Sequence, residues 1–335
     1  MSEAPSPPGD DRSGNTGSGN TGSGVGRSGD GSDGDASRET LTRAELAAHA
    51  GAVLSDRLDA AIGDHLRRKE KRPRDGAGWV DMSAHDLALR CPSRWSMPFD
   101  DFVVSVPTAA SALARLALRD RHDREPAGVA VARVASQLGD MDRQAAWFAQ
   151  WYDQELDRAG RAAVRAAATT WAVGALGATR GAALKWSTAR MRHEVVGRMI
   201  QLRTTWDAAT RGAHPDALLV MSARAPDDPV LELQAGFNAL VDALIRKQAP
   251  LRVRVGSAST AGTVKFAVTS ELLERTIDRV VQLVVWHVDR SAAPTVPGRW
   301  CADCHILDVC PDGPGLQEIE VRAVVAVDGT DPELG

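Results

Sequence analysis

Residues 301–310 read Cys301-Ala-Asp-Cys304-His-Ile-Leu-Asp-Val-Cys310, a Cys-x2-Cys-x5-Cys spacing. The one other cysteine of the chain is Cys91, and 209 residues separate it from Cys301. Four thiolates are the number that a tetrahedral zinc ion or a cubane iron–sulfur cluster requires. The sequence therefore predicts a metal centre with Cys91, Cys301, Cys304 and Cys310 as ligands, which would tie the start of a domain to its end.

Other uses of the cysteines fit the spacing less well. Cysteines that serve only as small buried hydrophobic residues would scatter, whereas a Cys-x2-Cys step brings two thiolates to one metal. The first 38 residues contain no apolar segment of the secretory type, so we expect a reducing, cytoplasmic compartment and no disulfides. All-thiolate ligation suits both iron and zinc, and His305 could replace one cysteine in a zinc site. The spacing alone does not decide between iron and zinc.

Composition indicates a globular body. The chain has 335 residues, of which 43% are hydrophobic, which is enough for one large domain or two modest ones. The formal net charge of −4 does not by itself indicate nucleic-acid binding, although basic surface can still occur locally. No run of 18 apolar residues is present, so we expect no membrane span and no membrane partner.

The N-terminal part divides into two segments. Residues 1–38 are rich in Gly, Ser and Asp and contain a near-repeat of Asn-Thr-Gly-Ser-Gly, which predicts a disordered tail. Residues 39–82 predict a helical segment, because Thr42 and Glu45 form a capping-box pattern ahead of apolar residues at helical spacing. This segment ends in the basic run 67–74, which suits a solvated helix end and a phosphate-contacting patch equally well.

The central part predicts helices around the first cysteine. Ser83 is expected to cap a short helix, residues 84–90, that delivers Cys91. From about residue 109 to 185 the Ala-rich sequence predicts a large helical insertion. Its aromatic stripe at helical spacing, residues 147–152, is interpreted as core packing and not as a base-stacking platform.

The C-terminal half predicts alternating strands and helices, β-β-α-β-β-α, closing on the cysteine trio. We expect the first strand at 194–203, a polar turn around 206–215, and an antiparallel partner at 217–224. A helix, two further strands and a last helix follow. The expected ranges of these four elements are 231–247, 251–256, 264–268 and 271–288. This order predicts an α/β sheet covered by helices.

This combination resembles the iron–sulfur branch of the PD-(D/E)XK nuclease superfamily, the RecB-like domains of AddB-type helicase–nuclease subunits and of CRISPR adaptation nucleases. In that family one cysteine precedes the nuclease core and three follow it with Cys-x2-Cys-x5-Cys spacing, holding a 4Fe-4S cluster. The segment Leu87-Ala-Leu-Arg-Cys-Pro-Ser-Arg-Trp95 also resembles the family's cysteine–proline segment. The resemblance spans residues 83–312, with 313–335 as a C-terminal extension. It implies a restriction-endonuclease-like core sheet with the helical insertion, closed by a metal staple with four cysteine ligands.

The active-site motifs depart from the family's pattern. The family carries an Asp in the first strand and an acid-x-Lys in the second, where the acids hold Mg²⁺ and the lysine orients the attacking water. Here Gly197-Arg-Met-Ile-Gln201 has no carboxylate, and Ser222 and Arg224 stand at the acid and lysine positions. A hydroxyl lacks the charge of a carboxylate, and arginine is not deprotonated in proteins. The resemblance therefore implies a DNA-binding protein without catalytic residues, with Arg198, Arg224 and Gln234 at the groove.

Two other functions fit the sequence. An active Mg²⁺-dependent DNA exonuclease would need Glu194 or Asp216 in a shifted strand register. A redox-responsive regulator would use the cluster as a sensor, as in the WhiB-like regulators, which share the trio spacing but are small proteins. In every case we expect DNA as the partner, together with a helicase or another subunit of a repair, recombination or defence complex.

Overall fold

The computed structural model describes residues 41–68, 80–87, 91–96, 104–122, 124–140, 143–180, 183–196, 199–222, 224, 228–258, 262–298, 301, 304, 306–307, 310 and 312. All of them belong to one compact unit that begins at Leu41. The expected N-terminal tail, most of the basic run 67–74, Arg198, His305 and the extension after residue 312 lie outside the described residues. No helix in the described ranges has an apolar stretch long enough to cross a membrane.

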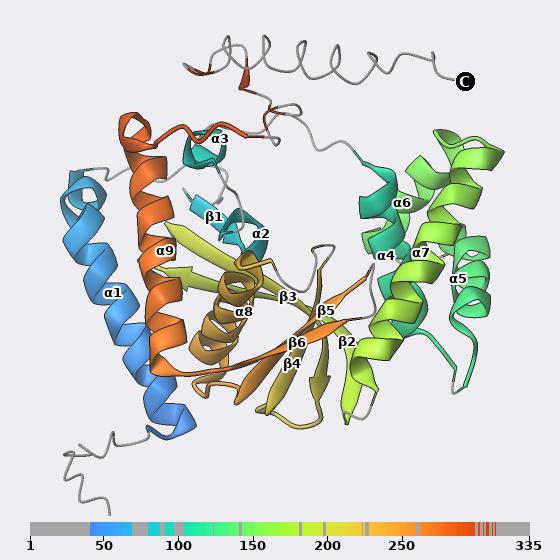
Figure 1. Ribbon diagram of the computed structural model, residues 1–335, viewed down its shortest axis with the longest axis horizontal. Helices are drawn as coiled ribbons and strands as arrows, with labels where there is room; N and C mark the ends of the chain where they lie inside the picture. The colour runs from blue at the N-terminus through green and yellow to red at the C-terminus, as the bar shows by residue number, and fades with distance from the viewer. Residues whose placement is uncertain are drawn as a thin grey trace, which may run out of the picture. The chain divides into compact units, whose positions relative to one another are not determined.

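The described elements form a mixed α/β fold, as the sequence predicted (Figure 1). They occur in this order: α1 (Arg43–Arg68), β1 (Val80–Ser83), α2 (Ala84–Leu87), α3 (Pro92–Ser96), α4 (Val106–Arg119), α5 (Ala127–Ser136), α6 (Arg143–Gln154), α7 (Arg158–Thr179), β2 (Leu184–Val195), β3 (Ile200–Thr210), β4 (Ala217–Ser222), α8 (Val230–Arg246), β5 (Arg252–Ser257), β6 (Thr263–Ala267) and α9 (Ser270–Val288). Two short 3-10 turns, Leu138–Asp140 and Arg290–Ala292, complete the described elements.

The strands form one mixed sheet, in which β3 has three partners. β2 pairs with β3 in antiparallel register from Leu184 opposite Thr210 to Val195 opposite Ile200. Since β2 occupies one edge of β3 for its whole length, β1 and β4 share the other edge. β1 is parallel to the start of β3, and β4 is antiparallel to its end. β4 then pairs with β5 in parallel and β5 with β6 in antiparallel orientation.

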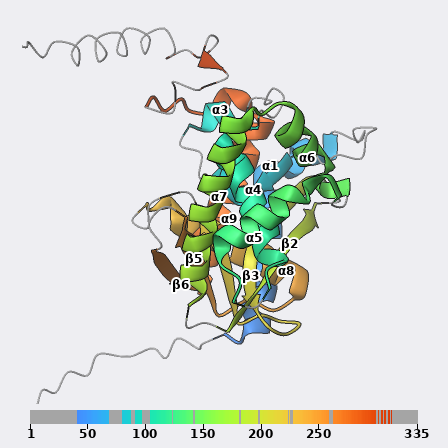
Figure 2. The ribbon, with the colours of Figure 1, turned by 90° about the vertical axis from the view of Figure 1, so that its right-hand side faces the viewer.

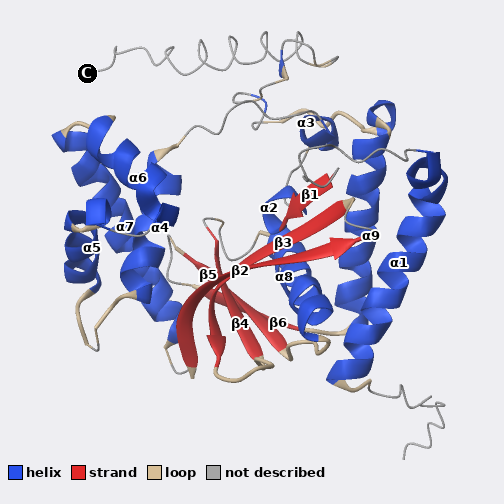
Figure 3. Cartoon of the chain, turned by 180° about the vertical axis from the view of Figure 1, so that it is seen from behind, coloured by secondary structure: helices blue, strands red, loops and turns tan. Residues whose placement is uncertain are grey.

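One face of the sheet packs on α8, α1 and α9 (Figure 3). α8 lies directly on this face and contacts β2, β3 and β5, while α1 and α9 pack against α8 and each other. The buried side chains of this core include Leu202, Phe237, Leu240 and Ile277. α1 starts at the capping box that the sequence predicted, because the backbone N–H of Thr42 donates to Glu45 at 2.7 Å and that of Glu45 donates to the Thr42 hydroxyl at 3.3 Å.

The helices α4 to α7 pack together and cover part of the opposite face (Figure 2). α4 pairs with α7 and contacts β2, and α7 also contacts β5. Their buried side chains, among them Phe148 and Trp171, form one core with Leu219 and Met221 of β4. Phe148 also contacts Tyr152 at a ring distance of 5.9 Å, and both are buried, so these two residues of the aromatic stripe pack in the core. A cavity remains among the sheet, α2, α4 and α8.

The structure corrects the first half of the predicted sheet. The range 194–203, expected as one strand, contains the turn that joins β2 to β3, and Val196 in this turn has a φ of 52°. The range 206–210, expected as a polar turn, belongs to β3, where Trp206 and Asp207 are buried. β1 lies at the end of a segment expected to be helical, and the helical insertion ends at Thr179 with β2 starting at Leu184. The helix expected at 84–90 is described for Ala84–Leu87.

The contact between α8 and α9 depends on a glycine. A Cβ atom added at Gly236 would overlap the hydroxyl of Thr276, which is itself buried and donates to the carbonyl of Leu272 at 2.8 Å. We therefore expect Gly236→Ala to lower the free energy of unfolding by about 1–3 kcal/mol, because a packed core resists added volume. Urea unfolding followed by circular dichroism measures this change.

Two further variants test the cause of that loss. Adding Thr276→Ala to Gly236→Ala removes the overlapping hydroxyl and should recover much of the stability. Gly139→Ala is the control, since a Cβ at that position meets nothing within 4 Å. If Gly236→Ala unfolds at the same urea concentration as the unchanged protein, α8 and α9 do not pack as closely as described.

Candidate functional site

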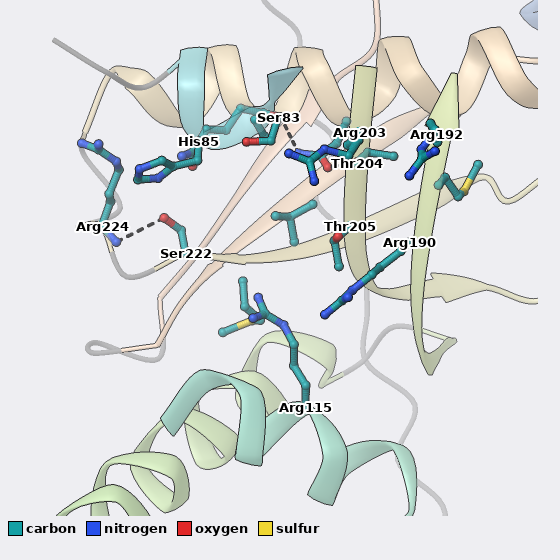
Figure 4. Close-up of a pocket in the computed structure, with 16 residues that line it drawn as sticks. Ser83, His85, Arg115, Arg190, Arg192, Arg203, Thr204, Thr205, Ser222 and Arg224 are labelled. Atoms are coloured by element: carbon teal, nitrogen blue, oxygen red, sulfur yellow. Dashed lines mark hydrogen bonds between the residues drawn. The ribbon is translucent and has the colours of Figure 1, made fainter. Parts of the chain in front are cut away.

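A cavity of about 960 Å³ is enclosed by the sheet together with α2, α4 and α8 (Figure 4). Its wall is built from the ends of β1 and β4, the middle of β2 and β3, the start of α2, one residue of α4 and one face of α8. The lining residues are Ser83, Ala84, His85, Arg115, Arg190, Met191, Arg192, Arg203, Thr204, Thr205, Val220, Met221, Ser222, Arg224, Gln234 and Asn238.

The cavity is strongly basic. Five of the lining residues are arginines, and the lining contains no Asp or Glu. Figure 4 shows Arg115 rising from α4 while Arg190 reaches from β2 toward the same space. The other polar groups on the wall are hydroxyls, amides and the imidazole of His85. Such a lining favours an anion with several oxygen acceptors, since guanidinium groups match phosphate geometry with paired N–H donors.

Three of the arginines are held by carboxylates that lie outside the wall. The Nε of Arg115 donates to Asp207 at 2.5 Å, and an Nη of Arg224 donates to Asp228 at 2.8 Å. Arg203 forms an ion pair with Asp81. Each carboxylate balances one guanidinium and also limits where it can point.

The remaining two arginines, Arg190 and Arg192, lie two residues apart on β2 and make no ion pair with a described residue. Alternate residues of a strand share a face, so both side chains leave the same side of the sheet. Arg192 stands directly opposite Arg203 on β3, and Arg190 stands opposite Thr205. Like charges in directly opposed positions repel, so this hairpin carries uncompensated positive charge beside the cavity.

Asp81 lies beside this pair of opposed arginines and forms an ion pair with Arg203. Burial raises the pKa of Asp81, and the positive charges of Arg203 and Arg192 oppose that rise. Asp81 therefore offsets part of the charge of these two arginines. One carboxylate beside Arg190, Arg192 and Arg203 leaves this part of the hairpin with a net positive charge.

Three of the site residues predicted from the sequence lie on the wall: Ser222 at the end of β4, Arg224 just after it, and Gln234 on α8. The hydroxyl of Ser222 accepts a hydrogen bond from the backbone N–H of Arg224 at 3.1 Å. Arg198 was also predicted, and it lies outside the described residues.

The sequence does not predict the other arginines of the wall. Arg115 falls in the expected helical insertion, to which no binding role is assigned, and Arg190 and Arg192 fall before the expected first strand. The alternation Arg190-x-Arg192-x-Glu194 is the signal that could have indicated a strand with one charged face. Nothing local marks Arg115, because its position on the wall depends on how α4 packs on the sheet.

Glu194 and Asp216, the acids considered for an active nuclease, do not line the cavity, and neither does Asp207 of β3. Asp207 is fully buried beside the cavity, and both of its oxygens accept hydrogen bonds, from Arg115 and from the backbone N–H of Met221. Asp216 is exposed and bonded to Arg43 of α1 at 2.5 Å. Glu194 is exposed on β2 and is not part of the wall.

A second, small cavity gathers all four cysteines. Cys91 is buried just before α3, and Cys301, Cys304 and Cys310 are half-buried in the segment after α9. The other described residues around this cavity are Thr295, Val296, Pro297, Ile306, Leu307 and Asp312. Among the described residues, no three His, Cys, Asp or Glu side chains are arranged as a metal coordination shell. The four predicted ligands therefore line one cavity. That they ligate a metal stays a prediction.

No family model matches the chain, and no curated protein matches it. Among solved structures, one described as "Crystal structure of SSO0001" aligns with a TM-score of 0.35 and 14% sequence identity, over 79% of this chain and 98% of that chain. A likeness at this level carries no argument about family, substrate or mechanism.

Proposed function

We propose that this protein binds DNA through the basic cavity, without hydrolysing it, as a component of a repair, recombination or defence assembly. The observation that carries the proposal is the wall itself, with five arginines and no carboxylate among its residues. DNA offers a continuous row of phosphates, and cations that contact them release bound counterions. We take a helicase or another subunit of such an assembly as the protein partner.

The same lining argues against hydrolysis. Nucleases of the resembled superfamily hold Mg²⁺ with carboxylates, and Mg²⁺ prefers hard oxygen ligands in a nearly octahedral arrangement. At the end of β4 the positions of the acid and the lysine are taken by Ser222 and Arg224, and Arg224 is bonded to Asp228. The cavity therefore offers phosphate-binding groups where a nuclease would offer metal ligands.

We also propose that the chain has the RecB-like PD-(D/E)XK fold. Two observations support it: strands β2 to β4 form an antiparallel series followed by α8 and the parallel strand β5, and a helical bundle precedes them. Arg224 and Gln234, which the resemblance assigns to the groove, both line the cavity.

We further propose a metal centre at the cysteine cavity, a 4Fe-4S cluster with zinc as the alternative. The donor set suits both, because thiolates ligate zinc and iron–sulfur clusters alike and Cys91, Cys301, Cys304 and Cys310 line one small cavity. Bound there, the centre would supply a cross-link between the α3 segment and the segment after α9. Mg²⁺ has no role in this proposal.

The test of DNA binding uses Arg190→Gln together with Arg192→Gln. Loss of two phosphate-contacting cations should weaken binding to a labelled duplex about tenfold or more and lower the salt slope by about two. Fluorescence anisotropy over a series of KCl concentrations gives both quantities. The control variant is Arg180→Gln with Arg211→Gln, which changes the net charge equally but removes exposed arginines that do not line the cavity.

Equal losses in the two double variants would mean that DNA is attracted by the overall charge and not by the cavity. Metal-dependent cleavage of linear DNA, abolished by a chelator and by loss of Arg190 and Arg192, would instead establish the exonuclease alternative. Visible absorption with iron and zinc analysis of anaerobically purified protein decides between the two metal centres.

A further inference from the structure

The fully buried carboxylate of Asp207 lies next to the cavity without being part of its wall. Burying a charged carboxylate is costly unless it is paired and hydrogen-bonded. In this position on β3 an apolar residue would pack without that cost, as Ala208 and Ala209 do beside it. The contacts of Asp207 should therefore explain why a charged residue occupies this buried position.

Asp207 uses both of its oxygens. Its Oδ2 accepts the backbone N–H of Met221 on β4 at 2.7 Å, which fixes the carboxylate relative to the sheet. Its Oδ1 accepts the Nε of Arg115 at 2.5 Å. The side chain of Arg115 comes from α4, so this ion pair connects the helical bundle to the sheet.

Arg115 is held on its other sides as well. Its guanidinium lies 5.1 Å from the ring centre of Trp171 on α7, and one Nη is 3.4 Å from the hydroxyl of Ser111. Its side chain keeps 28% exposure and lines the cavity, while Asp207 has none. The Nη2 group makes no hydrogen bond to a described residue, so it remains available to a ligand.

We propose that Asp207 is a positioning residue: it orients the guanidinium of Arg115 so that the Nη groups face a phosphate of the bound DNA. This inference rests on the proposed function and adds Arg115 and Asp207 to it. The stacking on Trp171 and the bond to Asp207 restrict the rotamers of Arg115 before DNA binds. Less side-chain entropy is then lost on binding.

The sign of one substitution separates positioning from simple charge effects. Asp207→Asn removes a negative charge close to the cavity, and Coulomb's law alone would then predict tighter binding of a polyanion. Positioning predicts weaker binding, because the asparagine no longer holds the guanidinium with a charge-assisted bond. A purely structural role predicts a lower melting temperature with the salt slope unchanged.

The experiment measures duplex binding by anisotropy at several KCl concentrations for the full-length chain. Asp207→Asn and Arg115→Gln should each weaken binding about tenfold and lower the salt slope by about one. In a double-mutant cycle, adding Asp207→Asn to Arg115→Gln should weaken binding no further, because Asp207 acts through Arg115. Arg119→Gln is the control on the same helix, since Arg119 is paired with Asp120 and does not line the cavity.

A further variant keeps the test decisive if Asp207→Asn does not fold. Arg115→Lys retains the positive charge but loses the planar fork, so it should bind DNA nearly as weakly as Arg115→Gln. Binding of Arg115→Lys equal to that of the unchanged protein would overturn the inference, as would unchanged or tighter binding by folded Asp207→Asn. If the unchanged protein does not bind DNA, the proposed function itself is wrong and the inference falls with it.

Discussion

Replacing Cys91 with serine should abolish binding of the proposed metal and lower the melting temperature as far as replacing Cys304 does. The two residues lie far apart in the sequence but line the same cavity, so either change would break the same proposed cross-link. Metal binding is coupled to folding in such sites, and structural zinc in finger peptides is bound with about 10–16 kcal/mol. A loss of several kcal/mol is therefore expected from the removal of one thiolate.

The measurement combines metal analysis with thermal unfolding of anaerobically purified protein. Val296→Ala is the control, because Val296 borders the same cavity but leaves all four thiols in place, and it should keep the full metal content. If Cys91→Ser retains the metal and melts with the unchanged protein, Cys91 is no ligand and the proposed cross-link does not exist.

The second large effect is expected for Arg246→Ala at neutral pH. Arg246 bonds to Asp242 at 2.9 Å, the carboxylate of Asp242 is fully buried, and its Oδ2 has no hydrogen-bond partner among the described residues. Removal of the arginine leaves a buried carboxylate without its counter-charge. Such a change costs about 3–5 kcal/mol in the free energy of unfolding.

The pH dependence identifies the cause. Burial raises the pKa of Asp242 from 3.8, and the hydrogen bond from Arg246 opposes that rise. The native state thus binds its proton more tightly than the unfolded state, so this group makes stability fall as the pH rises above 3.8 and through the raised pKa. Arg246→Ala raises the pKa further. Its destabilisation should be largest at neutral pH and shrink as the pH is lowered toward the unfolded value.

Denaturant unfolding across this pH range tests the prediction. Asp242→Asn added to Arg246→Ala should restore part of the stability at neutral pH, because it removes the uncompensated charge. Arg57→Ala is the control: Arg57 pairs with Asp278 on the exposed surface, where such pairs contribute about 1 kcal/mol or less. A loss for Arg246→Ala that does not change with pH would show that the packing of its side chain, and not the charge of Asp242, is responsible.

The helices and the later strands could be predicted from sequence because their signals are local. The capping box at Thr42 and the apolar spacing of α8 and α9 each determine an element within a few residues. The ranges expected for α8, β5, β6 and α9 agree with the structure to within one residue at every end. Thr269 is the N-cap of α9, where its side chain accepts a hydrogen bond from the backbone N–H of Leu272.

The β2–β3 hairpin could not be predicted in the same way. The chain turns at Val196, which has a φ of 52°, a conformation that β-branched residues rarely adopt. A turn is therefore not expected at a valine from sequence, and the apolar stretch around it is interpreted as the middle of a strand. β2 itself is rich in polar residues, because the cavity and not a core lies against part of it. Asp207 was expected in a turn because aspartate is seldom buried. Its buried position depends on Arg115, which is 92 positions away in the sequence.

The candidate site could be predicted only in part for the same physical reason. Ser222, Arg224 and Gln234 follow from motif positions, whereas Arg115, Arg190 and Arg192 reach the wall through packing between elements distant in sequence. The four cysteines are the exception, since their number and spacing predicted that they lie together, and they line one small cavity.

The opposition of Arg192 and Arg203 across the hairpin has an energetic consequence. Asp81 offsets part of their mutual repulsion, and a phosphate that entered would relieve the rest. Under the proposed function, relief of this repulsion would contribute to the affinity for DNA. Small inorganic anions in solution would relieve the same repulsion, so DNA would have to displace them before it occupied this position.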